Sequence, residues 1–226
     1  MSKPDKGRSR EAILRGEIPH GILGGNLYDG YGVSGEGFFR KLVNLGLKPD
    51  DTCVDYGCGT LRLGIHAIKY LEPGAYWGMD IANDFLEEGR KLVGDRLWQE
   101  KRPNLRLIST ASVTEVATAK PKLLFSVHVL KHVPPGKLSE YFHNIIKLIG
   151  PSGQAIIVGK WTDSETIQYD DESWIGSWAH AFSLLQNIVD SEGGRIKVIR
   201  GKKDVLSRVG RTATKGFLRV INKVQV

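Results

Sequence analysis

The chain has 226 residues, of which 41% are hydrophobic and 25% charged, so it is long enough for one sizeable core and has an ordinary globular composition. It contains no apolar run near the roughly 20 residues of a membrane-spanning helix, and its first ten residues are polar and basic, unlike a signal peptide. We therefore expect a cytoplasmic protein without membrane contact. The net charge of +7 permits an anionic partner but identifies none.

Residues 1–37 are predicted to form an arm that precedes the folded domain. A short helix is expected over residues 9–14, and the glycine-rich stretch from residue 21 onward argues against a regular element there. Tyr28 and Tyr31 in this stretch are candidates for a lid that closes over a bound substrate. A leader segment that merely contains these aromatic residues is the alternative.

The remaining chain, residues 38–226, reads as one domain in which strands alternate with helices. The expected strands cover residues 53–56, 75–79, 105–108, 123–127, 154–158, 196–199 and 217–220. The expected helices cover residues 38–45, 61–71, 84–97, 137–149 and 178–192. This alternation predicts a Rossmann-like α/β fold: a mostly parallel seven-stranded sheet with helices on both faces and an antiparallel C-terminal edge strand.

The segment VDYGCGTLR, residues 54–62, leads from the first strand into a helix. Gly57 and Gly59 allow a sharp turn and close approach of a ligand to the backbone, beyond the carboxyl end of a strand. A dinucleotide site would require a third glycine at the position of Arg62, so it fits poorly. Asp55 would repel a pyrophosphate and would favour a cationic group instead.

A second acidic residue, Asp80, ends the next strand. In nucleoside-binding sheets, a carboxylate at this point accepts hydrogen bonds from the ribose hydroxyls. The alternative is that Asp80 caps the helix expected to begin near Asn83. Two strand-end carboxylates with Gly-x-Gly between them are more specific than either one alone.

These segments resemble those of the class I S-adenosylmethionine-dependent methyltransferases. The similarity extends to residues 76–81, YWGMDI, and to residues 123–134, LLFSVHVLKHVP, which resemble the family's second and fourth strand motifs. The resemblance implies S-adenosyl-L-methionine as the cofactor. It also implies a cofactor set of Asp55, Gly57, Cys58, Gly59, Arg62, Asp80, Ile81, Ser112, Val113, Ser126 and His128. Two departures are Leu61 in place of the third motif glycine and a fourth strand without the usual acidic residue.

Methyl transfer from a sulfonium requires positioning and, for a hydroxyl acceptor, removal of a proton. His128 and His132 are the candidate general bases, because histidine titrates near neutral pH. A loop histidine that shapes the cofactor pocket and a helix-start residue that faces the structure are the respective alternatives. Cys53 and Cys58 are too poorly placed for a disulfide, and no metal-ligand spacing occurs, so we expect no metal.

The stretch after the fifth strand is expected to form a substrate wall. The candidate residues for stacking on a sugar or an aromatic acceptor are Trp161, Trp174, Trp178 and His180, although packing within the core would explain the tryptophans equally well. The favoured acceptor is a small molecule or a sugar. RNA or protein as the acceptor and a cofactor-binding module without catalysis remain as alternatives, and RNA would require an open basic face. The sequence indicates no oligomeric state.

Overall fold

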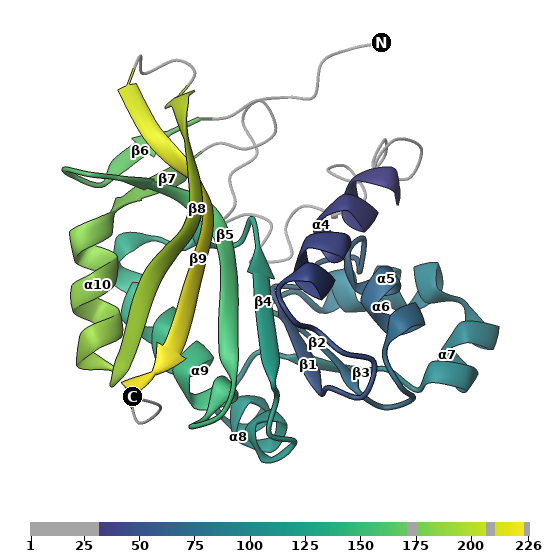
Figure 1. Ribbon diagram of the computed structural model, residues 1–226. Coiled ribbons are helices and arrows are strands. Elements are labelled where there is room, and N and C mark those ends of the chain that lie inside the picture. The colour runs from purple at the N-terminus through teal and green to yellow at the C-terminus, as the bar shows by residue number, and fades with distance from the viewer. Residues whose placement is uncertain (1–31, 171–175, 207–210, 224–226) are drawn as a thin grey trace, which may run out of the picture.

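The computed structural model describes residues 32–170, 176–206 and 211–223, and a nine-stranded sheet runs through its centre (Figure 1). The strands are β1 (Cys53–Tyr56), β2 (Tyr76–Asp80), β3 (Asn104–Leu107), β4 (Leu123–Val127), β5 (Gln154–Thr162), β6 (Ile167–Tyr169), β7 (Ser177–Ala181), β8 (Gly194–Leu206) and β9 (Arg211–Asn222). Strands β3, β2, β1, β4 and β5 are neighbours in that order and run parallel.

The sheet continues beyond β5 through the last two strands. Strand β9 pairs antiparallel with β5 on one side and with β8 on the other. The antiparallel C-terminal strand is therefore present as expected, with β8 as the outermost strand on this side. Strands β6 and β7 form a hairpin that pairs with the end of β5 through Trp161 and Thr162, beyond the end of β4. This hairpin raises the expected seven strands to nine.

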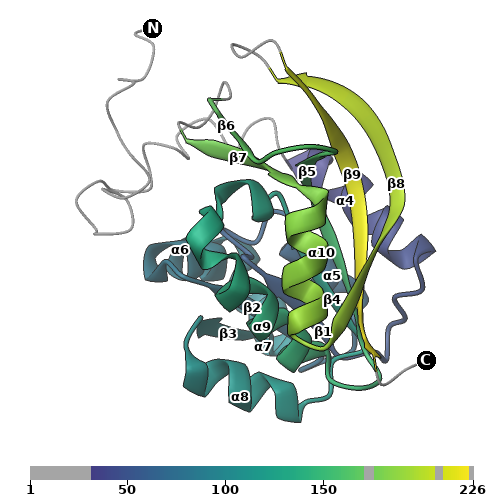
Figure 2. The ribbon, with the colours of Figure 1, turned by 90° about the vertical axis from the view of Figure 1, so that its left-hand side faces the viewer.

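Helices cover both faces of the sheet, as Figure 2 shows from the side. They are α4 (Gly32–Asn44), α5 (Gly64–Tyr70), α6 (Asn83–Val93), α7 (Asp95–Lys101), α8 (Thr110–Thr118), α9 (Leu138–Ile149) and α10 (Phe182–Ser191), with short 3-10 turns at η1 (Leu130–His132) and η2 (Pro135–Lys137). Helices α8, α9 and α10 bury their apolar sides on one face, and α4, α5 and α6 bury theirs on the other. Among the described residues, no helix has both the length and the apolar character to cross a membrane.

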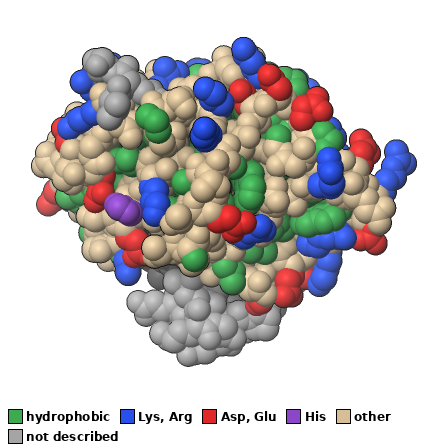
Figure 3. Space-filling model, turned by 90° about the horizontal axis from the view of Figure 1, so that it is seen from below, with side chains coloured by type: hydrophobic (Ala, Val, Ile, Leu, Met, Phe, Trp, Pro, Cys, Tyr) green, Lys and Arg blue, Asp and Glu red, His purple; other side chains and the backbone are tan. Residues whose placement is uncertain are grey.

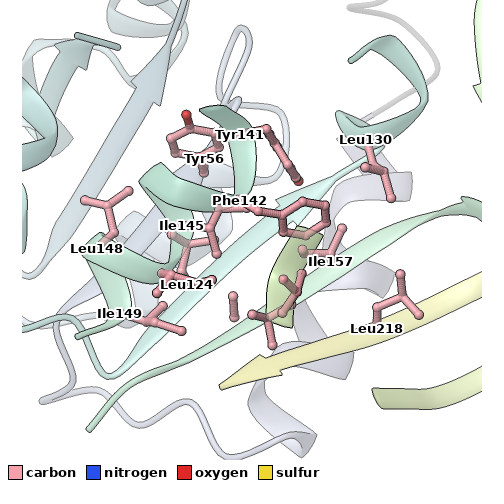
Figure 4. Packing of buried hydrophobic residues seen from close by; sticks show 14 of the residues in the cluster. Tyr56, Leu124, Leu130, Tyr141, Phe142, Ile145, Leu148, Ile149, Ile157 and Leu218 are labelled. Carbon is pink, nitrogen blue, oxygen red and sulfur yellow. The ribbon is translucent and has the colours of Figure 1, made fainter. Parts of the chain in front are cut away.

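Helix α9 illustrates how the core forms. Its apolar residues recur at helical spacing, so Phe142, Ile145 and Ile149 all point to the sheet and are fully or almost fully buried. They pack against β4 and β5, where Leu124 and Ile157 are completely buried (Figure 4). Burial of side chains of this size stabilises the fold by roughly 1.5–3 kcal/mol each.

Several element boundaries differ from the sequence prediction. Helix α4 begins at Gly32, so the end of the glycine-rich stretch is helical; the Gly35 position lies so close to the Arg62 carbonyl that a side chain would collide. Residues 177–181 form strand β7 instead of the start of a helix, because they pair with both β5 and β6. The expected helix 84–97 is divided by Gly94, whose φ is +74°. Helix α8 was not predicted from the sequence; it begins at a capping box formed by Ser109 and Ser112.

Candidate functional site

The carboxyl ends of the parallel strands bring the main candidate residues together at one edge of the sheet (Figure 1). Strand β1 ends in the glycine loop, β2 ends in Asp80, and β4 leads into His128. Strands β1 and β4 are neighbours although β2 and β3 follow β1 in the chain, so the strand order reverses between them. In open α/β sheets, ligands bind at such a reversal point.

The glycine loop is held against the neighbouring strand by its own backbone. The N–H groups of Gly57 and Cys58 both donate to the carbonyl of Met79, at 2.7 and 3.0 Å. Gly57 has a φ of +80°, and a side chain there would approach a methyl carbon of Val129 to 2.3 Å. Glycine is therefore required at position 57 by backbone conformation and by packing. Val129 was not identified from the sequence.

Gly59 has a different environment. Its φ is +54°, and a side chain at this position would meet no atom within 4 Å among the described residues. Its backbone N–H donates a hydrogen bond of 2.8 Å to Oδ2 of Asp80. Asp80 is 5% exposed, and its Oδ1 accepts a further bond from the Ala82 N–H at 3.1 Å. The loop therefore presents open space directly beside a buried carboxylate.

Leu61 occupies the position at which many methyltransferases carry the third glycine of this motif. Its φ is +62°, a left-handed conformation that glycine adopts most easily, and its side chain is completely buried. A side chain at Gly89 of α6 would approach Leu61 to 2.6 Å, so leucine fills space that the neighbouring helix leaves open. Leucine in place of glycine at position 61 therefore leaves the backbone of the loop in the left-handed conformation that glycine favours.

Asp55 lies beneath the loop and is 3% exposed. Its Oδ2 accepts a hydrogen bond of 2.9 Å from the phenol of Tyr76 on β2. Burial raises the pKa of the Asp55 carboxyl to about 8, although the Tyr76 hydrogen bond opposes the shift. The sequence analysis expected an ionised carboxylate that attracts a cationic group. In the structure, Asp55 is buried, and its neutral form is favoured near neutral pH. Its assignment to the cofactor stays a prediction.

Ser126 links the two strands at the reversal point. Its hydroxyl donates to the Tyr56 carbonyl at 2.8 Å and accepts from the Tyr141 phenol at 2.9 Å, and the side chain is completely buried. Asn144 on α9 donates to the Tyr56 phenol at 3.0 Å. Ser126 is therefore engaged in joining β4, β1 and α9 at the floor of the site. Its predicted contact with the cofactor has no support in these bonds.

His128 follows β4 in a left-handed conformation, with a φ of +63°, and its N–H donates to the Val158 carbonyl at 3.0 Å. Its ring contacts Phe38 of α4 edge to face, with centroids 5.4 Å apart. Burial lowers the pKa of the imidazole to about 4, and the charges of Lys131, Lys215, Arg62 and Lys160 lower it further. The ring is thus neutral near neutral pH, the state needed to accept a proton, but it is a weak base.

His132 lies in the 3-10 turn η1, where its N–H donates to the Val129 carbonyl at 2.7 Å. It follows His128 by one turn of irregular chain and is half-buried. Both histidine assignments stay predictions.

Two apolar side chains are exposed at the ends of adjacent strands. Ile81 follows β2 and is 53% exposed, and Leu107 ends β3 and is 45% exposed. Asp80 and Leu107 are register partners, so this apolar shelf, Ile81 and Leu107, adjoins the buried carboxylate. A flat apolar group such as a nucleobase would cover it. Leu107 was missed because a strand-end leucine gives no sequence signal of exposure.

Ser112 and Val113 lie in the first turn of α8 and are largely buried. Ser109 caps this helix: its hydroxyl accepts from the Ser112 N–H, and the Ser112 hydroxyl accepts from the Ser109 N–H. The Ser112 hydroxyl also donates to the Leu107 carbonyl at 2.6 Å, and Val113 packs in the core. Their side chains therefore position the helix beside the apolar shelf.

The candidate substrate-binding residues divide into three groups. Tyr28, Tyr31 and Trp174 lie outside the described residues. Trp161 and His180 are buried register partners in β5 and β7, with exposed fractions of 3% and 0%, so they pack inside the protein and do not form a substrate wall. Trp178 is half-exposed on β7.

The remaining chemical groups are few. Cys53 and Cys58 are both buried free thiols, as expected from their spacing. Arg62 is exposed at the start of the segment that leads to α5. Within the described part of the chain, no group of three or more His, Cys, Asp or Glu side chains could hold a metal ion.

Solved structures resemble this architecture closely in fold and weakly in sequence. The magnesium protoporphyrin IX methyltransferase of Synechocystis PCC 6803, solved with bound S-adenosylmethionine, has a TM-score of 0.57 at 16% identity over 94% of this chain and 89% of its own. A methyltransferase of Methanosarcina mazei has a TM-score of 0.57 at 12% identity over 79% and 95% of the two chains. The complex of DhpI with S-adenosylhomocysteine has a TM-score of 0.55 at 11% identity over 94% and 96%.

This chain has the class I methyltransferase fold. No protein-family model matches its sequence, and no curated protein matches it either. In this chain, the glycine loop lies at the reversal of strand order, and Asp80 and the apolar shelf lie along the same carboxyl edge at the ends of β2 and β3. The β6–β7 hairpin, inserted after β5, extends the sheet above the end of β4.

Proposed function

We propose that this protein transfers a methyl group from S-adenosylmethionine to an acceptor. The observation that carries the proposal is the arrangement at Gly59, where open space adjoins the buried carboxylate of Asp80 and the exposed apolar shelf. A nucleoside needs these three features: backbone clearance, a hydroxyl acceptor and an apolar surface for the base. The fold supports the assignment, since structures of similar fold contain bound S-adenosylmethionine or S-adenosylhomocysteine.

When bound, S-adenosylmethionine supplies an activated methyl group and a good leaving group. Asp80 would hold the ribose hydroxyls, and Ile81 and Leu107 would cover the base. Gly59 would admit the methionine part without steric conflict, and Gly57 would hold the turn of the loop. The tasks of the protein are then to position two reactants and to exclude water, which together can supply most of the rate enhancement of a displacement. His128, neutral near pH 7, would accept the proton of a hydroxyl acceptor.

A small-molecule or sugar acceptor is the expectation that we carry forward from the sequence, and a neighbour in fold is described as a methyltransferase of magnesium protoporphyrin IX. A nucleic-acid acceptor is the second candidate, and the exposed cations Lys197, Arg200 and Lys202 of β8 support it. The buried thiols fit the reducing cytoplasm. The preserved conformation at Leu61 argues that the loop remains suited to binding.

Calorimetric titration with S-adenosylmethionine, S-adenosylhomocysteine and NAD tests the proposal. The first two should bind and NAD should not. Asp80→Asn, which keeps one hydrogen-bond acceptor, should weaken S-adenosylmethionine binding by roughly tenfold, about 1.4 kcal/mol. Asp163→Asn, an exposed carboxylate on another part of the surface, is the matched control and should bind as the wild type does. Tight NAD binding, or equal affinity in the two variants, would contradict the assignment.

A further inference from the structure

One face of strands β5, β9 and β8 carries a concentration of basic side chains. Directly paired residues point to the same face of a sheet. Lys160, Lys215 and Lys202 are paired across the three strands, and Arg219 is paired with Lys197 two rows further along. The other cations of this face are Arg200, which is paired with Phe217, and Arg195, which is paired with Ile221.

The opposite face of the same strands is the apolar one. Leu218 and Val220 are completely buried against the cluster that contains α10. Figure 2 shows α10 on that side of β8 and β9, whereas Figure 1 shows α4 beside β4 and away from β8. The basic face is defined as Lys160, Arg195, Lys197, Arg200, Lys202, Lys215 and Arg219. It is open along β8 and at Lys215, where side chains are exposed, whereas on β5 it is covered: Ile156 and Val158, the register partners of Arg219 and Phe217, are buried.

Few carboxylates neutralise this face. Lys160 pairs with Asp204 at 2.8 Å. Within residues 32–170, 176–206 and 211–223, the other six cations of the basic face form no ion pair. A row of like charges on adjacent strands destabilises the sheet unless an anion lies over it. The charge pattern therefore favours an extended anionic partner over a single small ion.

The basic face reaches both ends of the sheet. At the amino end it enters a cavity of about 550 Å³, lined by Lys48, Lys122, Lys197 and Arg219 together with Asp51. Lys and Arg side chains are spread over this end of the molecule, with Asp and Glu between them (Figure 3). At the carboxyl end, Lys160 and Lys215 lie close enough to His128 to lower its pKa. The basic face thus extends from the cavity to the candidate site.

An aromatic pair lies midway along the basic face. Phe217 of β9 is half-buried, and its ring centroid lies 6.2 Å from that of Phe38 on α4. The Lys41 ammonium lies over both rings, at 4.9 Å from Phe38 and 5.6 Å from Phe217. Proteins that bind single-stranded nucleic acid combine a cationic track for the phosphates with aromatic side chains on which bases stack.

We propose that the basic face binds single-stranded nucleic acid, with the phosphates along β8 and β9 and a base against Phe217. A duplex is less suited, because duplex readers insert a helix or a strand ribbon into a groove, whereas this surface is an open sheet. The binding does not depend on methyl transfer, so it can be tested without the cofactor. A strand bound in this way would extend toward His128, because Lys160 and Lys215 lie near that residue.

The test is fluorescence anisotropy of labelled oligouridine and oligothymidine, titrated with the whole chain at salt concentrations from about 50 to 200 mM. Wild-type affinity should fall steeply with salt. The triple variant Lys197→Gln, Arg200→Gln, Lys202→Gln changes three exposed residues of β8, and should bind on the order of tenfold more weakly at low salt. Its slope of log affinity against log salt should decrease by roughly 0.7 for each lost phosphate contact.

The matched control removes the same charge elsewhere. Lys69→Gln, Arg96→Gln, Lys120→Gln changes exposed residues on α5, on α7 and after α8, and should bind as the wild type does. Equal weakening in both triple variants, or no binding of either oligonucleotide at low salt, would overturn the proposal. So would binding of the wild type to anionic phosphatidylserine vesicles in preference to the oligonucleotides. S-adenosylmethionine binding should be unchanged in both variants, which separates this proposal from that of methyl transfer.

Discussion

Tyr76 donates a hydrogen bond of 2.9 Å to Asp55, so the first carboxyl group of the glycine loop is bound by a side chain of the neighbouring strand. A side chain at Gly64 of α5 would approach the Tyr76 hydroxyl to 2.3 Å, so the phenol is enclosed between β1 and α5. The pair joins β1 to β2 at the floor of the loop, while burial of Asp55 favours its neutral form and the Tyr76 hydrogen bond opposes that shift of the pKa.

Asp55→Asn should change how stability depends on pH. Burial raises the pKa of Asp55 to about 8 in the folded protein, from 3.8, so between these values the folded state holds a proton that the unfolded chain has lost. The stability from the protonated carboxyl is full below pH 3.8 and is lost as the pH rises through 8. As the pH rises across this range, the free energy of unfolding of Asp55→Asn should therefore increase relative to that of the wild type, by at most about 1.4 kcal/mol per pH unit.

Urea unfolding at several pH values measures this difference. Asn keeps an oxygen that accepts the Tyr76 hydrogen bond, so the fold should be retained. Asp163→Asn, at an exposed position, should leave the pH profile parallel to that of the wild type. Parallel profiles for Asp55→Asn would show that the carboxyl is ionised in the folded state, contrary to our expectation.

The two glycines of the loop should respond differently to alanine. Gly57→Ala would collide with Val129 and should lower the melting temperature as well as S-adenosylmethionine affinity. Gly59→Ala meets only open space, so it should cost about 1 kcal/mol of backbone strain and mainly reduce affinity. Thermal unfolding and calorimetry on both variants separate these effects.

Two further variants sharpen that comparison. Val129→Ala should partly restore the stability of Gly57→Ala, since it removes the colliding methyl groups. Gly193→Ala, at another position of positive φ with open space around it, should match Gly59→Ala in stability but bind S-adenosylmethionine normally. If Gly193→Ala reduced affinity as much as Gly59→Ala, the space beside Gly59 would not be the binding site.

At Leu61, glycine should be less harmful than alanine. Loss of this buried side chain costs roughly 2–5 kcal/mol in either variant. Glycine removes the left-handed strain, however, so Leu61→Gly should be more stable than Leu61→Ala by about 1 kcal/mol. Chemical denaturation provides the measurement. Leu124, equally buried in β4, is the control, and there the alanine variant should be more stable than the glycine variant. If the alanine variant were the more stable one at both positions, the proposed strain at Leu61 would be refuted.

Ser126 and Tyr141 should show coupled energies. Ser126→Ala removes the hydrogen-bond partner that the Tyr56 carbonyl and the Tyr141 phenol share, which should cost roughly 1–3 kcal/mol. Tyr141→Phe removes only one bond. In a double-mutant cycle measured by urea unfolding, the combined loss should be smaller than the sum of the two single losses. Strict additivity would mean that the two hydroxyls do not interact in solution.

The pKa of His128 should respond to the basic face. Burial and four nearby cations lower it to about 4, so the imidazole should remain neutral from neutral pH down to about pH 5. Proton NMR titration should show an upward pKa shift in Lys215→Gln, because one of these charges is removed, and little change in Lys223→Gln, which lies at the other end of β9. An unshifted His128 resonance in Lys215→Gln would contradict the electrostatic cause.

The sequence predicted the strands best where a strand has a clear local pattern of its own. The strands at 53–56 and 123–127 were located to the residue, because each is a short apolar run bounded by polar or turn residues. The β6–β7 hairpin was missed, since residues 177–181 owe their conformation to pairing with β5 and β6 and not to their own pattern.

The site shows the same division. The positions of Asp80 and of the two glycines follow from their order along β1 and β2. The engagement of Asp55 by Tyr76, the contact of Gly57 with Val129 and the exposure of Leu107 depend on side chains from different strands. The basic face was not predicted either. Four of its cations lie close together in residues 195–202, but the pairing of β8 with β9 and of β9 with β5 is what brings Lys215, Arg219 and Lys160 to the same face.

The internal position of β9 has a consequence for how the chain folds. Strand β8 is joined to the sheet only through β9. The residues of β8 are synthesised first, but they cannot pair with the sheet until β9 has been synthesised. During synthesis, β8 and the edge of β5 therefore stay open until residues 211–222 have left the ribosome. An open edge of this kind can pair with other chains, so the chain would be most prone to aggregate in the interval before β9 is inserted.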